Sequence, residues 1–317
     1  MKALVTGAAG FIGSTLSTVL SDRGAQVVGL DCFTDYYGRD IKEGNLAPLR
    51  ARKTFQFIEG ALQTVSMDEL LDGVTHVFHL AAQAGVRKSW GQDFQAYTSH
   101  NVDGTQRLLE ALKPRTLSKL VYASSSSVYG DIAAIPMKED AMVQPVSPYG
   151  VTKLAAEHLC NLYFVNHQVP SVSLRYFTVY GPKQRPDMGF HRFIRAALLD
   201  QEISLYGDGE QTRDFTFVGD IVAATIAAGD RGTPGAVYNI GGGSRVTINE
   251  VLDLIGRITG RTLKIKRLPS EKGDMRDTFA DTTRARQELG FLPTHTLESG
   301  LRAECAWLAG LLGQTLP

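Results

Sequence analysis

The segment 6–13, with the sequence Thr-Gly-Ala-Ala-Gly-Phe-Ile-Gly, restricts the possible fold more than any other part of the chain. It follows the apolar run 3–5, which is typical of a strand, and it opens a segment with helical spacing. Its GxxGxxG pattern permits a tight turn in which backbone N–H groups and a helix N-terminus face a pyrophosphate. A strand-to-helix turn without a ligand would share this pattern. We expect the turn to bind a dinucleotide through Gly7, Gly10, Phe11, Ile12 and Gly13.

Strand-like and helix-like segments alternate through the first half of the chain. The expected strands are 3–5, 26–30, 54–58, 76–80, 119–123 and 171–176. This alternation indicates right-handed βαβ units and a parallel sheet that is covered on both faces. The predicted fold class is therefore α/β, a Rossmann-type doubly wound parallel sheet.

Beyond residue 176 the alternation of strands and helices loosens. The expected elements there are a helix at 193–199, a buried strand at 236–240 and a helix at 248–258. We expect a smaller C-terminal α/β domain that binds the substrate. The dinucleotide-binding domain would comprise 1–175 and 214–243, and the substrate-binding domain would comprise 176–213 and 244–317.

Asp31 directly follows the expected strand 26–30 and lies 18 residues beyond Gly13. At this position a carboxylate can hold both hydroxyls of a ribose. Because no arginine immediately follows Asp31 to accept a 2′-phosphate, the sequence favours NAD over NADP as cofactor. An exposed acid in a turn is the alternative interpretation of Asp31.

A helix is expected to begin at the segment Ser-Pro-Tyr-Gly-Val-Thr-Lys, with Ser147 as N-cap and Pro148 in the first helical position. Tyr149 and Lys153 are four residues apart and therefore share one helix face. A tyrosine acts as a general base only if its pKa falls well below ~10. A neighbouring ammonium, a helix N-terminus and a cationic nicotinamide would all lower that pKa. Since this spacing also arises by chance, the pair alone does not establish catalysis.

Four consecutive serines, from Ser124 to Ser127, follow the expected strand 119–123. Ligands and catalytic groups collect at the carboxyl ends of strands in open α/β sheets. Hydroxyls that satisfy the backbone of their own loop are the alternative, but the position of the serines favours catalysis.

Six motifs occur in a fixed order and span nearly the whole chain: TGAAGFIGS, HLAAQAG, SSSSVYG, YGVTK, LRYFTVYGP and GDGEQTRDFTFVGD. In these motifs the sequence resembles the extended short-chain dehydrogenase/reductase family of nucleotide-sugar epimerases and dehydratases. The resemblance implies that Ser125 hydrogen-bonds the sugar 4-hydroxyl, that Tyr149 is the base and that Lys153 binds the nicotinamide ribose. The further cofactor contacts that it implies are Leu80, Ala81, Ala82 and Tyr176.

The same resemblance extends to the nucleotide of the substrate and to the assembly. It implies that Tyr206 stacks on uracil, that Arg213 meets the diphosphate and that Asp274 contacts the nucleoside. It also implies a homodimer formed through two helices of each subunit, one of them led by Tyr149. The sequence departs from the family at Ala61, where an aspartate near adenine is usual. This departure weakens one adenine contact but not the assignment of NAD.

Several residues bear on which family member the chain resembles. Dehydratases and decarboxylases usually carry an acid two positions before the tyrosine of VYG, where this chain has Ser127. Because elimination needs an acid–base pair, this serine disfavours dehydration. The segment 175–188 resembles that of UDP-glucuronate 4-epimerases, and a guanidinium can hold a carboxylate by two parallel hydrogen bonds. The residues assigned to a uronate carboxylate are Thr178, Arg185, Ser126 and Ser127. A surface ion pair between Arg185 and Asp187 is the alternative.

The predicted reaction is the NAD-dependent C4 epimerisation of a UDP-sugar, UDP-glucuronate to UDP-galacturonate. Tyr149 would take the O4 proton while C4 gives its hydride to NAD⁺, and hydride return to the opposite face of a transient 4-keto sugar would invert C4. Rigid clamping of the carboxylate would oppose loss of CO₂ from this β-keto acid. The alternatives are a 4-epimerase of a neutral UDP-hexose, in its plain or N-acetyl form, a UDP-glucuronate decarboxylase and a non-catalytic NAD-sensing protein. The retained tyrosine–lysine pair disfavours the last.

The charge balance excludes some partners. With 33 basic and 33 acidic side chains the formal net charge is zero, so no global field steers the chain to nucleic acid or to an anionic membrane. Basic residues are nevertheless in local excess over 171–199, where the uronate and diphosphate are expected to dock. Arg87 is a further candidate substrate contact.

The cysteines and histidines point to a metal-free protein of a reducing compartment. Three separated cysteines without a CxxC motif indicate neither a disulfide framework nor a zinc site, and favour the cytoplasm. No apolar run approaches the roughly 18 residues of a membrane span. His76 and His79 are expected on opposite faces of one strand, so no metal site is predicted.

Overall fold

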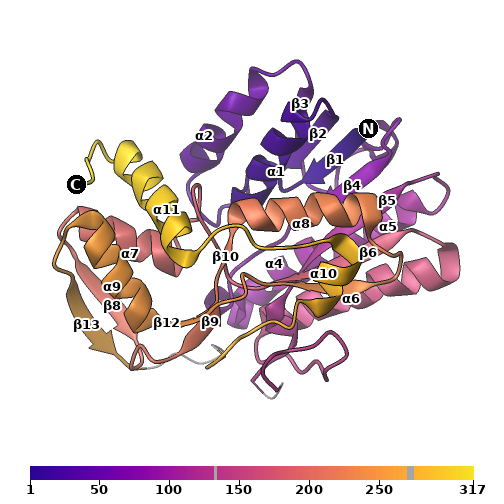
Figure 1. Ribbon diagram of the computed structural model, residues 1–317. Coiled ribbons are helices and arrows are strands. Elements are labelled where there is room, and N and C mark those ends of the chain that lie inside the picture. Colours follow the sequence, from indigo (N-terminus) through magenta and orange to yellow (C-terminus); the bar gives the residue numbers. More distant parts are fainter. Residues whose placement is uncertain (132–133, 270–274) are drawn as a thin grey trace.

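The computed structural model describes residues 1–131, 134–269 and 275–317 and contains a seven-stranded parallel sheet (Figure 1). Its strands are ordered β11-β6-β5-β4-β1-β2-β3. Their bounds are β1 Lys2–Thr6, β2 Gln26–Asp31, β3 Phe55–Glu59, β4 His76–His79, β5 Lys119–Ser125, β6 Ser171–Tyr176 and β11 Val237–Ile240. The strand order runs outward from β1 in one direction and from β4 in the other. This order confirms the Rossmann-type doubly wound α/β fold, and it predicts a ligand crevice at the carboxyl ends of β1 and β4.

Helices cover both faces of the sheet. On one face lie α1 (Phe11–Asp22) and α8 (Val218–Arg231), and on the other lie α5 (Gly104–Leu112) and α6 (Pro148–His167). The strands are therefore buried on both sides, which explains why they read in the sequence as continuous apolar runs rather than as alternating patterns.

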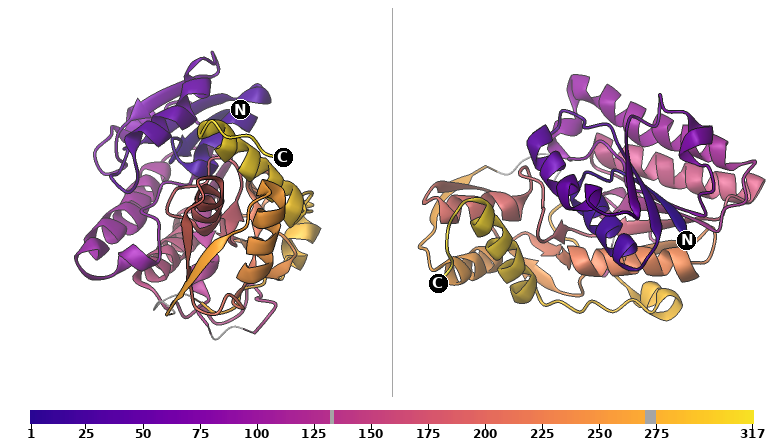
Figure 2. Two further views of the ribbon diagram at one scale, coloured as in Figure 1. Left: turned by 90° about the vertical axis from the view of Figure 1, so that its left-hand side faces the viewer. Right: turned by 90° about the horizontal axis from the view of Figure 1, so that it is seen from above.

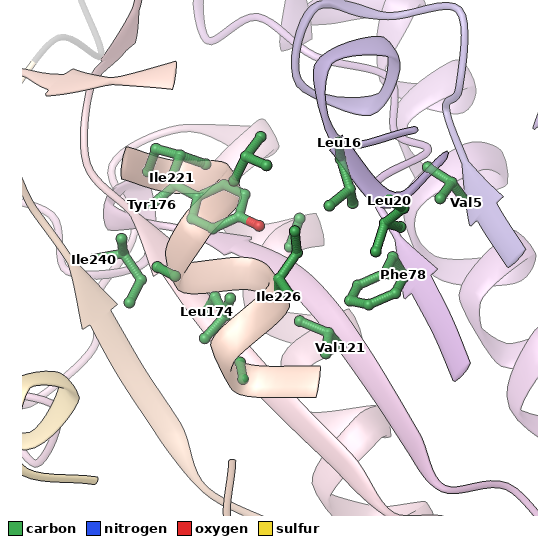
Figure 3. Close-up of a cluster of buried hydrophobic side chains, with 14 of the residues drawn as sticks. Val5, Leu16, Leu20, Phe78, Val121, Leu174, Tyr176, Ile221, Ile226 and Ile240 are labelled. Carbon is green, nitrogen blue, oxygen red and sulfur yellow. The ribbon is translucent and has the colours of Figure 1, made fainter. Parts of the chain in front are cut away.

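Alternate side chains of each strand contribute to two different cores. Val5 belongs to the core beneath α1 and α8, whereas its neighbour Leu4 belongs to the core on the opposite face. Figure 3 shows Leu20 of α1 and Ile226 of α8 directed into the first of these cores, beside Phe78 and its neighbours. Each such side chain contributes roughly 1.5–3 kcal/mol when it is fully removed from water. These cores fix the strand ends from which the site is built.

Further helices connect these elements. They are α2 (Arg39–Arg50), α3 (Met67–Leu70), η1 (Arg87–Ser89), η2 (Gly91–Asp93), α4 (Phe94–Tyr97), the π-helical segment η3 (Thr98–Asp103), η4 (Ser126–Val128) and α10 (Thr283–Leu289). Within the ranges described here, no helix combines the length and the apolar character needed to cross a membrane.

A second group of elements forms a smaller lobe beside the sheet (Figure 2). Its helices are α7 (Gly189–Leu198), α9 (Ile248–Thr259) and α11 (Leu297–Leu311). Its short strands pair two by two: β7 (Val179–Tyr180) with β10 (Thr216–Phe217), β8 (Glu202–Tyr206) with β13 (Lys264–Leu268), and β9 (Thr212–Asp214) with β12 (Arg245–Thr247). A separate apolar core joins the three helices of this lobe.

We propose the two-domain division expected from the sequence, with two refinements. The segment 214–217, which that division assigns to the dinucleotide-binding domain, ends β9 and forms β10 of the smaller lobe. The separate apolar core of the smaller lobe supports a C-terminal domain. However, Ala285 and Leu289 of α10, which follow residue 244 in the chain, belong to the core beneath α1 and α8. The C-terminal segment therefore returns to the sheet before it enters α11.

The helical parts of the C-terminal half differ most from the sequence expectation. The helix expected at 193–199 begins earlier, at Gly189, because Phe190, Phe193 and Ile194 lie together on its buried face. The helices α8 and α11 have no counterpart among the expected elements. The apolar face of α8 mixes large side chains such as Ile221 and Ile226 with small ones such as Ala224 and Ala228, and the small residues weaken the periodic signal.

Candidate active site

A cleft opens where the strand order diverges, at the carboxyl ends of the central strands. Its empty space is about 1160 Å³ including the part that is open to solvent, somewhat above the range of roughly 300–1000 Å³ typical of small-ligand pockets. All residues predicted to bind the dinucleotide line it: Gly7, Gly10, Phe11, Ile12, Gly13, Asp31, Leu80, Ala81, Ala82, Tyr149, Lys153 and Tyr176. The parallel sheet brings these separate segments to one edge.

The glycine-rich turn forms one wall of the cleft. Gly7 has φ +73°, a conformation that residues with a side chain rarely adopt, and a Cβ there would lie 3.0 Å from the backbone nitrogen of Ala81. A Cβ on Gly13 would lie 2.0 Å from the carbonyl oxygen of Gly7. The N-cap of α1 is Gly10, which has no side chain to satisfy the first N–H groups of the helix. This helix N-terminus lines the cleft and suits an anionic group.

Asp31, at the end of β2, is held at the cleft by backbone contacts. Its Oδ2 accepts a hydrogen bond from the N–H of Ala9 at 3.1 Å, and its Oδ1 accepts one from the N–H of Phe33 at 2.9 Å. A carboxylate accepts about four hydrogen bonds. Asp31 therefore keeps acceptor capacity for hydroxyl groups of a ligand.

Tyr149 enters the cleft from the first turn of α6. Ser147 caps this helix by accepting a hydrogen bond from the N–H of Gly150 at 3.1 Å, and Pro148 occupies its first position, as the sequence indicated. Burial raises the pKa of the Tyr149 phenol, while a hydrogen bond with Ser125 and the charge of Arg185 lower it. The sequence led us to expect a net lowering, so burial is the stronger influence here.

Lys153 lies one turn farther along α6 and is almost completely buried. Burial lowers the pKa of its ammonium to about 7, although the nearby Cys160 and Glu157 favour the charged form. Its Nζ lies 4.5 Å from the centre of the Tyr122 ring, a favourable position for a cation. Tyr149 and Lys153 thus share one face of α6 and line the same cleft.

The serine run divides into residues with different surroundings. Ser125 ends β5 and accepts a hydrogen bond from the N–H of Ser127 at 3.1 Å, and its side chain lowers the pKa of Tyr149. Ser124 instead donates to Glu157 at 2.6 Å inside the protein. Ser126 is buried in the short helix η4. Ser125 is therefore the serine that the fold places against the candidate base.

Arg185 lines the same cleft, and its guanidinium already has a carboxylate partner. Its Nε and Nη2 donate to the two carboxylate oxygens of Asp187, each at 3.0 Å. The side chains are 21% and 32% exposed, respectively. The structure therefore shows both features considered from the sequence, a position at the cleft and the ion pair with Asp187.

The predicted nucleotide-binding residues Tyr206 and Arg213 lie in the smaller lobe. The guanidinium of Arg87, in η1, lies 4.5 Å from the centre of the Tyr206 ring in β8. Arg213, in β9, donates from Nη1 to the carbonyl oxygen of Arg276 at 2.8 Å. Arg87 and Tyr206 thus connect the segment after β4 to the smaller lobe, but neither is among the residues that line the cleft.

Two further residues, Thr178 and Asp274, were predicted to contact the substrate. Thr178 lies between β6 and β7, where its carbonyl oxygen accepts a hydrogen bond from the N–H of Thr216 at 2.9 Å. Its hydroxyl has no role in that contact. Asp274 lies outside the residues that the structure describes.

Three side chains that the sequence pattern did not single out also line the cleft: Tyr36, Tyr37 and Lys42. The two tyrosines lie between β2 and α2, and Lys42 donates to the carbonyl oxygen of Thr34 at 2.8 Å. Their place just after Asp31, at the carboxyl end of a strand, was the available signal. The general rule for strand ends would have found them without any motif.

Asn101 is a further residue that the sequence did not mark. It lies in the π-helical segment η3, where its Oδ1 accepts a hydrogen bond from the N–H of Gln83 at 2.7 Å. Its Nδ2 donates to the hydroxyl of Thr152 at 2.9 Å. Asn101 therefore ties the cleft segment after β4 to the helix that carries Tyr149 and Lys153. Single π-helical turns often occur at functional sites.

The crevice of a doubly wound sheet, the glycine-rich turn and the Tyr149–Lys153 pair together define a nucleotide-binding Rossmann-type protein with a candidate base at its strand ends. The chain belongs to the NAD dependent epimerase/dehydratase family, whose sequence model matches residues 3–241.

Individual relatives match this chain over almost its whole length and almost the whole of theirs. The chain is 44% identical to an uncharacterized UDP-glucose epimerase of Bacillus subtilis, over 98% of this chain and 99% of that protein. It is 37% identical to a UDP-glucuronate 4-epimerase of Thermodesulfobacterium geofontis, over 96% and 95% of the two chains. The crystal structure of UDP-glucuronic acid 4-epimerase from Bacillus cereus, in complex with UDP-glucuronic acid and NAD, is similar with a TM-score of 0.95 and 44% identity. That match covers 98% of this chain and 100% of the other.

Proposed function

We propose that the protein catalyses the NAD-dependent epimerisation of a UDP-sugar at C4 and interconverts UDP-glucuronate and UDP-galacturonate. The position of Tyr149 and Lys153 together in a cleft lined by the glycine-rich turn carries this proposal. Support comes from the 44% identity with the Bacillus cereus UDP-glucuronic acid 4-epimerase, which binds UDP-glucuronic acid and NAD.

The cleft residues fit NAD. The glycine turn and the uncapped N-terminus of α1 would hold the pyrophosphate, and Asp31 would accept hydrogen bonds from a ribose. Lys153 would hold the ribose next to the nicotinamide. When bound, NAD supplies a reversible hydride acceptor for the C4 position of the sugar.

The protein's own groups would manage the proton of the sugar 4-hydroxyl. Ser125 would orient this hydroxyl, and the phenolate oxygen of Tyr149 would accept its proton. Because burial opposes ionisation of Tyr149, the Ser125 hydrogen bond and the positive charges of Arg185 and Lys153 are needed to stabilise the phenolate. The proton would return to O4 once the configuration at C4 has inverted.

A uronate carboxylate would be recognised by polar groups at the far end of the cleft. Arg185 offers a planar pair of donors, and Ser126, Ser127 and Thr178 would add hydroxyls. Tyr206 would stack on uracil, and Arg213 would approach the diphosphate. Together these groups would hold the substrate at both ends while C4 reacts.

A second candidate is the 4-epimerisation of a neutral UDP-hexose. The name of the Bacillus subtilis relative, a UDP-glucose epimerase, favours this candidate. The Arg185–Asp187 pair also favours it, because Arg185 keeps a counter-charge when the sugar carries none. Decarboxylation of UDP-glucuronate is the next alternative.

Incubation of the purified protein with UDP-glucuronate, UDP-glucose and UDP-N-acetylglucosamine, followed by NMR of the products, tests the proposal. We expect UDP-galacturonate as the main product without added NAD, because the cofactor should copurify. A UDP-pentose as the main product would identify a decarboxylase instead. Turnover of UDP-glucose alone would establish the second candidate.

We further propose a cytoplasmic homodimer. Val151, Leu162 and Val165 are 50–60% exposed on α6 and lie on one side of this helix, which supports assembly through it. All three cysteines are free thiols, which suits a reducing compartment. Light scattering after size-exclusion chromatography tests the dimer, and Leu162→Asp should convert it to a monomer.

A further inference from the structure

The loop between β7 and α7 places a carboxylate where a substrate carboxylate is expected. Arg185 and Asp187 are separated only by Pro186, whose ring restricts the backbone between them. Their two hydrogen bonds, both 3.0 Å, form the parallel arrangement in which a guanidinium recognises a planar carboxylate. Asp187 therefore occupies the donor pair of Arg185 that a uronate would use.

A third residue helps to hold Asp187 in this position. The hydroxyl of Tyr36 donates to Oδ2 of Asp187 at 3.3 Å, and the Tyr36 ring lies 5.7 Å from the Arg185 guanidinium. A Cβ on Gly85 would lie 1.9 Å from the Tyr36 hydroxyl, so only glycine at this position lets Tyr36 approach. Tyr36 and Arg185 both line the cleft. Arg185 thus presents its guanidinium at the cleft wall, while Asp187 binds it from the solvent-exposed side of the loop.

From this geometry we infer that Asp187 is a specificity-determining residue, an internal carboxylate that competes with the substrate carboxylate for Arg185. The inference rests on the proposed function, because it assumes that Arg185 binds the uronate. Asp187 lowers the advantage of a charged sugar, since a uronate must displace it or share the guanidinium. Asp187 also makes a neutral sugar acceptable, because Arg185 is never left buried without a counter-charge.

Removing the charge of Asp187 should therefore increase the preference of the enzyme for UDP-glucuronate over UDP-glucose. In Asp187→Asn the guanidinium keeps a neighbour of the same shape but loses its anionic partner. A uronate would then supply the missing charge, whereas a neutral hexose would not. We expect the ratio of kcat/KM for UDP-glucuronate to kcat/KM for UDP-glucose to rise roughly tenfold, mainly through KM, as for loss of one charge-assisted contact.

The experiment compares the wild-type holoenzyme with Asp187→Asn, Arg185→Ala and the double variant. Asp200→Asn is the matched control, because Asp200 pairs with Lys264 at 2.6 Å on the exposed surface, neither residue lines the cleft, and the charge change is the same. Calorimetric affinities for UDP-glucuronate, UDP-glucose and UDP give the same comparison if one sugar is turned over too slowly. UDP reports general electrostatic attraction without the sugar. Asp187→Ser replaces Asp187→Asn if the latter does not retain NAD.

We expect the ratio of kcat/KM for UDP-glucuronate to kcat/KM for UDP-glucose to be higher than wild type in Asp187→Asn and lower in Arg185→Ala. In the Arg185→Ala background, Asp187→Asn should not change this ratio further. An unchanged or reduced ratio in Asp187→Asn overturns it, as does an equal gain in affinity for UDP. If the wild-type protein epimerises UDP-glucuronate normally, such a result refutes the role of Asp187 alone. If the wild type does not act on UDP-glucuronate, the proposed substrate fails and this inference fails with it.

Discussion

Arg175 and Glu157 form a two-point ion pair inside the protein. Nη2 of Arg175 donates to Oε1 of Glu157 at 2.6 Å and Nε donates to Oε2 at 3.1 Å, with both side chains 5% exposed. Ser124 adds a hydrogen bond to the same carboxylate at 2.6 Å. Glu157 lies one turn beyond Lys153 on α6, and Ser124 precedes Ser125 on β5. The carboxylate of Glu157 therefore joins α6 to β6 through Arg175 and to β5 through Ser124, so that it connects the two elements that carry the candidate catalytic residues.

We predict that Glu157→Gln destabilises the protein by about 3–5 kcal/mol, because it leaves the guanidinium of Arg175 buried without a counter-charge. Urea unfolding of the two holoproteins measures this loss. The control is Glu298→Gln, which removes an exposed pair with Arg302 and should cost less than ~1 kcal/mol. Equal losses in the two variants would show that burial of the Arg175 charge is not what makes Glu157 necessary.

A methyl group on the glycine-rich turn should abolish cofactor retention. In Gly13→Ala the added Cβ would lie 2.0 Å from the carbonyl oxygen and 2.8 Å from the carbonyl carbon of Gly7, so the turn itself must move. We expect at least a tenfold loss of bound NAD, measured by absorbance after denaturation of the purified protein. Gly44→Ala on α2 is the control, since no atom lies within 4 Å of its added Cβ. That variant should be neutral or more stable by about 0.5–1 kcal/mol and should retain NAD.

The hydrogen bond of Ser125 should be visible in the pH dependence of the reaction. It lowers the pKa of Tyr149, so its loss in Ser125→Ala should raise that pKa. Because the phenolate is the active form, the rising limb of kcat against pH should move to higher pH, and kcat below that limb should fall roughly tenfold for the loss of one hydrogen bond. Profiles between pH 6 and 10 with UDP-glucuronate measure this shift. A uniform loss of rate with an unmoved limb would assign Ser125 to substrate orientation alone. The control is Ser299→Ala, which changes an exposed serine of α11.

Local patterns made the nucleotide-binding half of the fold predictable. The turn at Gly7 and the pairing of Tyr149 with Lys153 depend on spacing within a few residues, and the strand ends then bring them together. The pairing of Arg185 with Asp187 was considered from the sequence, but its position beside the cleft depends on Tyr36, which lies about 150 residues away in the chain. Such contacts depend on tertiary structure and leave no periodic signal.

Glu304 is the clearest case of a residue whose surroundings the sequence conceals. It lies within α11 and has no exposed surface, and its Oε2 accepts a hydrogen bond from the N–H of Gly181 at 2.7 Å. In the described part of the chain its Oε1 has no hydrogen-bond partner. Burial raises the pKa of this carboxyl well above its ordinary value. Glu304 thus links α11 to the start of the loop that carries Arg185.

This raised pKa implies a definite pH dependence of stability. Below about pH 4.3 the carboxyl is protonated in both the folded and the unfolded chain, and it contributes no difference. Above that pH the unfolded chain ionises while the folded chain does not, so the wild-type protein loses stability as pH rises toward the folded-state pKa of Glu304. The loss approaches ~1.4 kcal/mol for each pH unit.

We therefore predict that the stability of Glu304→Gln relative to the wild type increases with pH. The amide oxygen still accepts from Gly181, and any cost of placing an amino group at the Oε1 position is the same at every pH. At every pH below the folded-state pKa of Glu304, the difference in unfolding free energy should move in favour of the variant as pH rises, by up to ~1.4 kcal/mol for each pH unit. Urea unfolding at pH 6, 7 and 8 measures it, with Glu298→Gln on the same helix as control for the loss of a charge. If the unfolding free energies of the wild type and Glu304→Gln change with pH in the same way, Glu304 is ionised in the folded protein. Its hydrogen bond from the N–H of Gly181 is then made to a charged carboxylate.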